Sequence, residues 1–127
     1  MSTVDEASVI AHQLDEVTEG TRRGNRTWFV AGKAFMWERP FTKADLKRRG
    51  DVTQPSGPIL ALSVEDLDDK QAALAAHPRS FFTISHFDGY AAVLVQVDRA
   101  TKRELAEAIR DAWLASAPAR LTSGYVR

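Results

Sequence analysis

The sequence predicts an α+β fold in two layers, with helices packed against one antiparallel sheet. Aromatic and β-branched runs separated by turn residues indicate strands joined by hairpins. Three other segments carry apolar residues at helical spacing, and these are too few to cross over every strand. The expected order is helix, three strands, helix, two strands, helix. At 127 residues, one domain over residues 1–127 is expected.

The first element is expected to be a helix over residues 4–17. Small and apolar residues recur there at steps of three and four, which is typical of a helix with one buried stripe. These residues are Val4, Ala7, Ser8, Ala11, Leu14 and Val17. Thr3 and Glu6 fit a capping box at its start, and Glu19-Gly20 is a suitable end.

A tight hairpin is expected next. Residues 27–30 and 34–37 are rich in aromatic and β-branched side chains, and Ala31-Gly32-Lys33 lies between them. Pro40 ends the second strand because proline cannot donate a ladder hydrogen bond.

An extended basic connection over residues 39–57 follows the hairpin. Residues 41–50 within it are expected to form one or two helical turns, begun by Thr42 and ended by Gly50. Lys43 and Lys47, four residues apart, would then share one face of this short helix.

The second half of the chain alternates strands and helices. Residues 59–62, 81–84 and 91–97 are expected to be strands, the last two joined through a turn at Asp88-Gly89. Ser63 is the expected cap of a helix over residues 65–76. Thr101 begins a long helix to about Ala117, and the C-terminal tail is residues 118–127. The residues of this helix expected to face inward are Leu105, Ile109, Ala112 and Trp113.

The formal net charge is zero, but the charge is unevenly distributed along the chain. Residues 1–20 hold five acids and no Lys or Arg. Residues 21–50 hold nine bases against two acids. Clustered Lys and Arg are what contact with nucleic-acid phosphates requires, and nearby aromatic residues could stack on bases. The alternative is a solvated basic face, or one paired with the acidic first helix.

No motif indicates an enzyme or a cofactor. The chain has no cysteine, its three histidines lack metal-ligand spacing, and no serine lies in a nucleophile elbow. Phosphate-binding glycine motifs are missing as well. The expectation is therefore a non-enzymatic protein without metal or cofactor. The acidic, polar start and the lack of a long apolar run predict a cytoplasmic protein with no membrane partner.

Two stretches of sequence carry a family resemblance. Gly32-Lys33-Ala34-Phe35 is similar to a hairpin of the MmcQ/YjbR family, and residues 77–95 resemble its pattern P-x-x-F-F-x-x-x-H-[FY]-x-G-Y-x-x-V-L-V. The resemblance extends from Val17 almost to the C-terminus. It departs from the pattern at Ala91-Ala92, where many members have tryptophan, and in the longer connection 39–57.

The resemblance implies the same order of helices and strands, in a fold described as a double wing. The family is usually labelled DNA-binding, so double-stranded DNA is the expected partner, contacted mainly through phosphates. The residues expected to bind it are Lys33, Arg39, Lys43, Lys47, Arg48 and Arg49, flanked by Arg22, Arg23 and Arg26.

Two other functions stay open at the level of sequence. The acidic and basic segments could pair across a homodimer, which would make the chain a protein-interaction module, and monomer and dimer are not distinguished. The weaker alternative is a small-molecule pocket near His86, Tyr90 and Trp113.

Overall fold

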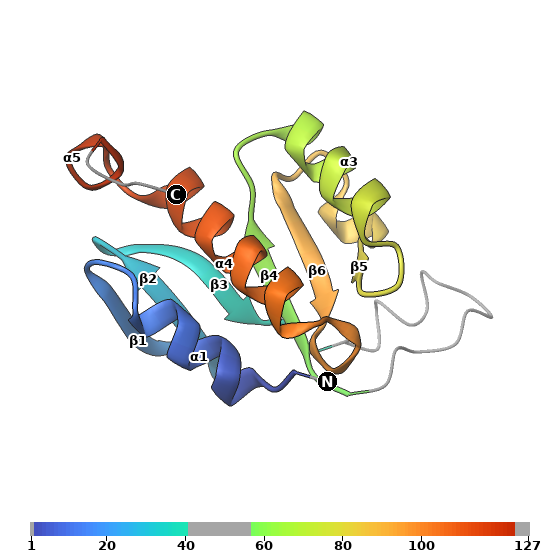
Figure 1. The fold of residues 1–127 in the computed structure, drawn as a ribbon, viewed down its shortest axis with the longest axis horizontal. Helices are drawn as coiled ribbons and strands as arrows, with labels where there is room; N and C mark the ends of the chain where they lie inside the picture. The colour runs from blue at the N-terminus through green and yellow to red at the C-terminus, as the bar shows by residue number, and fades with distance from the viewer. Residues whose placement is uncertain (1, 41–56, 124–127) are drawn as a thin grey trace.

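A computed structural model describes residues 2–40 and 57–123. They form a six-stranded sheet in the order β1-β2-β3-β4-β6-β5, with every neighbouring pair antiparallel. Helices cover one face of this sheet (Figure 1). The strands are β1 (Val17–Arg22), β2 (Asn25–Val30), β3 (Lys33–Glu38), β4 (Ile59–Ser63), β5 (Phe81–Phe82) and β6 (Ala92–Gln96). The helices are α1 (Val4–His12), α3 (Leu67–Ala76), α4 (Lys102–Ser116) and α5 (Ala119–Thr122), with short 3-10 turns η1 (Ser85–Phe87) and η2 (Val97–Arg99).

The predicted two-layer α+β class is confirmed, but the first helix is shorter than expected. α1 ends at His12, and residues 17–22 form the edge strand β1, in which Val17 pairs with Val30. The sheet therefore has one strand more than the five that the sequence predicts. The apolar stripe still reaches the core, because Leu14 and Val17 pack against it from the connecting turn and from β1.

Two hairpins of the same type build the first half of the sheet. Their two-residue loops are Arg23-Gly24 and Ala31-Gly32, and all four residues have positive φ, between 49° and 84°. This geometry is that of a type I′ turn, whose twist matches the twist of the flanking strands. The hairpin predicted around Ala31-Gly32 is confirmed, whereas the hairpin at Arg23-Gly24 was not anticipated.

Helix boundaries follow local capping chemistry. The cap of α3 is Asp66, whose side chain accepts a hydrogen bond from the backbone N–H of Asp69, rather than the predicted Ser63, which ends β4. The prediction for α4 is confirmed. Thr101 and Glu104 form a complete capping box, and all four residues expected to face inward are buried.

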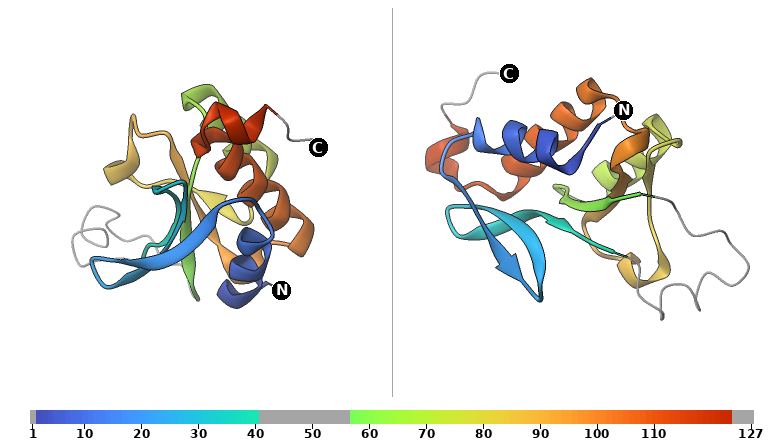
Figure 2. Two further views of the ribbon diagram at one scale, coloured as in Figure 1. Left: turned by 90° about the vertical axis from the view of Figure 1, so that its left-hand side faces the viewer. Right: turned by 90° about the horizontal axis from the view of Figure 1, so that it is seen from below.

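The sheet has apolar side chains on both faces. Ala7, Leu105, Ile109 and other residues of the helices meet the strands on the helix-covered face. A smaller cluster on the opposite face brings Ile84 and Phe87 against β4 and β6, with Trp37 and Phe82 packed at its margin. Figure 2 shows the helices on one side of the sheet and the segment between β5 and β6 on the other. This segment covers only part of that second face.

Part of the predicted basic connection lies outside the described residues. This applies to the short helix over 41–50 and to the loop up to residue 56. The C-terminal tail is described to Ser123 and contains α5. None of the helices in residues 2–40 and 57–123 combines the length and the apolar character needed to cross a bilayer.

Candidate functional site

A groove of about 730 Å³ lies on the sheet face that the helices leave uncovered. β2, β3, the loop at Arg23 and the segment between β5 and β6 supply its walls. Four of the predicted basic residues line it together with four aromatic rings. The bases are Arg22, Arg23, Lys33 and Arg39, and the rings are those of Trp37, His86, Phe87 and Tyr90. We call this the basic groove.

The hairpins determine where these bases lie. Arg22 and Arg23 are at the loop between β1 and β2, whereas Lys33 begins β3 and Arg39 directly follows it. Since a strand rises about 3.3 Å per residue, Lys33 and Arg39 are roughly 20 Å apart along β3. The positive charges therefore lie along the groove rather than at one point.

Little negative charge opposes these bases. Arg22, Arg23 and Lys33 are exposed, and none forms an ion pair with an acid in the part of the chain that the structure describes. Among the described residues, Glu38 is the acid that lines the groove, and its carboxylate accepts a hydrogen bond of 3.0 Å from the backbone N–H of Arg26. The net charge of the groove lining within residues 2–40 and 57–123 is thus positive.

Arg26 belongs to the other face of the sheet, so it does not join the predicted set. Its guanidinium donates to Glu19 at 2.9 Å and to Asp5 at 3.2 Å, and it lies 5.0 Å from the ring centroid of Trp28. The hydrogen bond from Arg26 is the main reason why the pKa of Glu19 is lowered to about 2, against the opposing effect of burial. This arginine stabilises the fold between α1 and the sheet.

The other predicted bases fall outside the described residues. Lys43, Lys47, Arg48 and Arg49 all lie in residues 41–56, so their part in a binding surface stays a prediction. Pro40 lines the groove and directly precedes this segment, so the chain continues from a groove residue into its most basic stretch.

Aromatic rings of β3 and of the segment between β5 and β6 pack on one another. The ring centroids of Trp37 and Tyr90 are 6.4 Å apart, and those of Phe87 and Tyr90 are 5.4 Å apart in an edge arrangement. The guanidinium carbon of Arg39 lies 5.7 Å from the ring centroid of Phe87. Phe87 is buried, whereas Tyr90 is 50% exposed. Tyr90 therefore presents a ring to the solvent in the groove.

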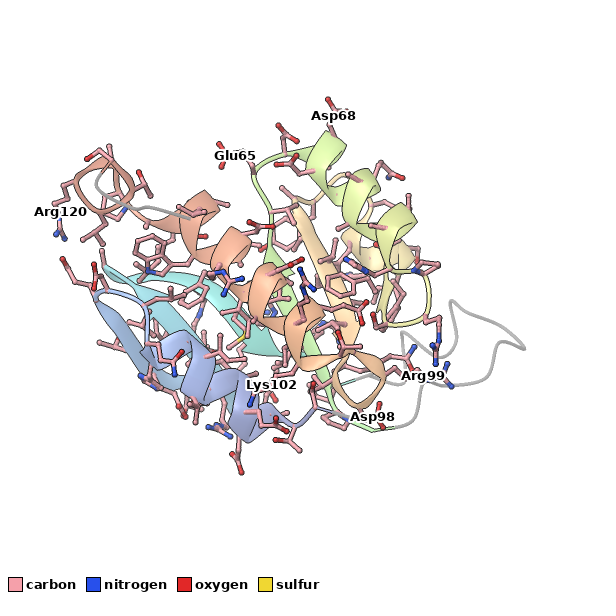
Figure 3. The ribbon with its side chains drawn as sticks, viewed as in Figure 1. Glu65, Asp68, Asp98, Arg99, Lys102 and Arg120 are labelled. Atoms are coloured by element: carbon pink, nitrogen blue, oxygen red, sulfur yellow. The ribbon has the colours of Figure 1, made fainter. Side chains whose placement is uncertain are left out.

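A second hollow, of about 560 Å³, lies between α3 and α4 on the helix side. Its lining includes apolar residues, among them several alanines of α3 and α4. Its acidic lining residues are Glu65, Asp69, Glu104, Glu107 and Asp111, and no Lys or Arg of the described part of the chain lines it. Figure 3 shows Glu65 and Asp68 at the start of α3, on this side of the molecule. This acidic cleft would repel a phosphate backbone.

The structure does not bring together the three residues named for the small-molecule alternative. His86 and Tyr90 line the basic groove, whereas Trp113 of α4 is buried on the other side of the sheet. Its indole N–H donates to the backbone oxygen of Asp15. In the described residues, no three acidic or histidine side chains are arranged to hold a metal ion.

The comparisons with known proteins identify the family. A model described as YjbR matches residues 12–115, which is most of the chain. The chain belongs to the YjbR family. This confirms the resemblance seen in the hairpin at Gly32-Lys33 and in residues 77–95.

Curated relatives of this YjbR-family chain carry no functional name. The proteins "Uncharacterized protein Mb2600" of Mycobacterium bovis and "Uncharacterized protein Rv2570" of Mycobacterium tuberculosis are each 38% identical to it over 128 residues. The match covers 99% of this chain and 97% of each relative. A crystal structure of Deinococcus radiodurans protein DR2400, a DUF419 domain, matches with a TM-score of 0.63. At 21% identity over 90% of this chain and 78% of that one, this likeness shows the fold alone.

One residue of this YjbR chain supports the groove and was not predicted. Lys70 on α3 is only 3% exposed, and its Nζ donates to the backbone oxygens of Phe87 at 2.6 Å and Tyr90 at 2.9 Å. Burial lowers the pKa of Lys70, while the charge of Asp88 partly opposes this effect. The sequence gives no signal for this role, because Lys70 stands among acids and alanines on a helix and looks like an ordinary surface lysine. Its partners lie 17 and 20 residues away.

Proposed function

We propose that this YjbR-family protein binds nucleic acid through the basic groove, as a binding protein rather than an enzyme. The observation that carries the proposal is the gathering of Arg22, Arg23, Lys33 and Arg39 beside exposed aromatic surface on one sheet face. Such bases bind a polyanion by releasing its counterions, whatever its sequence. Aromatic rings beside them add contacts that a purely electrostatic surface lacks.

The position of the acids supports the same assignment. The acidic cleft between α3 and α4 lies on the helix side, so a phosphate backbone on the groove side is separated from it by the sheet. Glu38 is held by the backbone of Arg26, which leaves its charge partly compensated by that hydrogen bond. A polyanion would therefore meet mainly positive charge along the groove.

The test is a salt titration of binding with matched charge variants. Fluorescein-labelled mixed-sequence DNA, as a single strand and as a duplex, is titrated with protein at about 50 and 200 mM salt and followed by anisotropy. One variant combines Arg22→Ala, Arg23→Ala and Lys33→Ala. The control combines Lys102→Ala, Arg103→Ala and Arg110→Ala, three exposed bases of α4.

The groove variant should bind at least tenfold more weakly at the lower salt. The slope of log affinity against log salt should fall by roughly 2, since each phosphate contact contributes about 0.7 to 0.9. The control, with the same change in net charge, should keep the wild-type slope. Lack of binding to either form of DNA at 50 mM salt, or equal losses in the two variants, would contradict the proposal.

A third variant addresses the predicted bases outside the described residues. Lys47→Ala, Arg48→Ala and Arg49→Ala are combined in one protein and measured in the same titration. A salt slope smaller than that of the wild type would show that the binding surface extends beyond Pro40. An unchanged slope would limit it to the groove.

A further inference from the structure

The shape of the basic groove bears on which form of nucleic acid it accepts. The groove is a hollow of about 730 Å³, a size typical of sites for small molecules. Duplex DNA is read by elements that protrude into its grooves, such as a helix or a two-stranded ribbon. A hollow with aromatic walls suits instead a group that can enter it.

The aromatic side chains are placed where a base could reach them. Tyr90 is half exposed, and its ring lies 6.4 Å from Trp37 and 5.4 Å from Phe87. In a duplex the faces of the bases are covered by stacking on their neighbours. An unpaired base has a free face and can stack on an aromatic side chain, which contributes without regard to sequence.

The backbone holds this aromatic surface in place before any ligand binds. Gly89, with φ of 74°, makes the turn that precedes Tyr90. Lys70 of α3 holds the carbonyl oxygens of Phe87 and Tyr90 through two hydrogen bonds. A surface fixed in this way loses less conformational entropy on binding.

We propose that the groove binds single-stranded nucleic acid in preference to duplex, with an unpaired base stacked on Tyr90 beside Trp37. Arg22, Arg23 and Lys33 then contact the phosphates that flank this base. This inference rests on the proposed function, because it specifies the substrate class of the same groove.

The experiment compares one labelled strand of about 12 nucleotides with its duplex, by anisotropy at about 50 mM salt. The variants are Tyr90→Ala, Tyr90→Phe and, as a control, Leu67→Ala, which removes another half-exposed large apolar side chain on α3. Thermal unfolding of each variant establishes that it is folded before binding is measured.

The single strand should bind at least tenfold more tightly than the duplex. Tyr90→Ala should weaken binding of the single strand roughly fivefold to a hundredfold, the range of one lost base stack, and leave the salt slope unchanged. Tyr90→Phe should retain most of the affinity because it keeps the ring. Leu67→Ala should change nothing.

Tryptophan emission gives a second readout. Trp28 and Trp113 are buried on the helix side, so a base that stacks beside Trp37 should quench mainly that residue. The quenching by the single strand should disappear in Trp37→Phe.

The possible outcomes separate this inference from the proposed function. Equal affinity for strand and duplex that is lost in the Arg22, Arg23 and Lys33 variant but is insensitive to Tyr90→Ala would overturn the single-strand inference alone. Binding of neither form would overturn both.

Discussion

Glu19 joins three elements through one carboxylate. It accepts hydrogen bonds from Ser8 of α1 at 3.0 Å and from Arg26 of β2, while it lies on β1 itself. Ser8 in turn accepts from the indole N–H of the fully buried Trp28. The lowered pKa of Glu19, about 2, makes this network a source of pH dependence in stability.

The sign of that dependence follows from the direction of the shift. A carboxyl group with a lowered pKa in the folded state stabilises the fold fully above its unfolded value of 4.5, and this contribution is lost as the pH falls towards 2. Glu19→Gln should therefore lower the unfolding free energy by about 1 kcal/mol at pH 7, a value limited by solvent screening. Urea unfolding at pH 7, 5, 4 and 3 should show the difference from wild type narrowing between pH 5 and 3.

A matched control is Glu65→Gln, an exposed acid on the loop before α3 (Figure 3). It should leave the unfolding free energy within a few tenths of a kcal/mol of wild type at each pH. If the Glu19→Gln difference were constant from pH 7 to pH 3, the Glu19 carboxylate would not be the titrating group.

At the scale of elements, one lysine couples the helix layer to the groove. Lys70→Met keeps the length of the side chain but leaves the carbonyl oxygens of Phe87 and Tyr90 without their donor. We expect a loss of about 1–3 kcal/mol in unfolding free energy. Hydrogen exchange should become faster at the amides of residues 85–91 and stay unchanged in α4.

Lys102→Met is the control for this change, since it removes the same group from an exposed position on α4 (Figure 3). If residues 85–91 exchange at the wild-type rate in Lys70→Met, the lysine does not hold this segment. If the segment does loosen, weaker binding of single-stranded DNA should accompany it, although Lys70 does not line the groove.

Local signals explain which elements could be predicted. α4 combines a capping box with a clean apolar stripe, so its start and its buried face follow from neighbouring residues. β1 offers no such signal, because it is an edge strand whose side chains are mostly exposed. Glu19 and Gly20 look like a helix end in the sequence. Gly20 is instead a strand residue opposite Thr27, placed there by pairing with β2.

The sequence predicted the charges of the candidate site and named His86 and Tyr90 as pocket residues, but it did not predict how the rings and the bases meet. Arg22, Arg23, Lys33 and Arg39 stand out as bases in the sequence, and the fold brings them to one groove. The contact between Trp37 and Tyr90 depends on the strand order β3-β4-β6, which no local pattern reveals. Arg26 does not line the basic groove because its side chain lies on the other face of β2, and this too could not be read from the local sequence.

At the scale of the whole molecule, the opposite charges of the N-terminal segments are partly paired within one chain. Of the five acids in residues 1–20, Asp5 and Glu19 bind Arg26, and Glu16 binds Arg120 of α5. Figure 3 shows Arg120 at the end of the molecule where α5 lies. These pairs reduce the negative charge that a second copy could use for contact with a basic segment.

Pairing within the chain therefore predicts a monomer, in place of the dimer held together by the acidic and basic segments. Light scattering at about 50 and 500 mM salt should give the mass of one chain, 14.1 kDa, at both concentrations. Charge pairing between copies would instead give a dimer at the lower salt that dissociates at the higher salt, because exposed ion pairs are screened. Such a dimer would favour the protein-interaction alternative. If the Arg22, Arg23 and Lys33 variant then failed to form the dimer, the basic groove would be the surface that binds the acidic segment of a second copy.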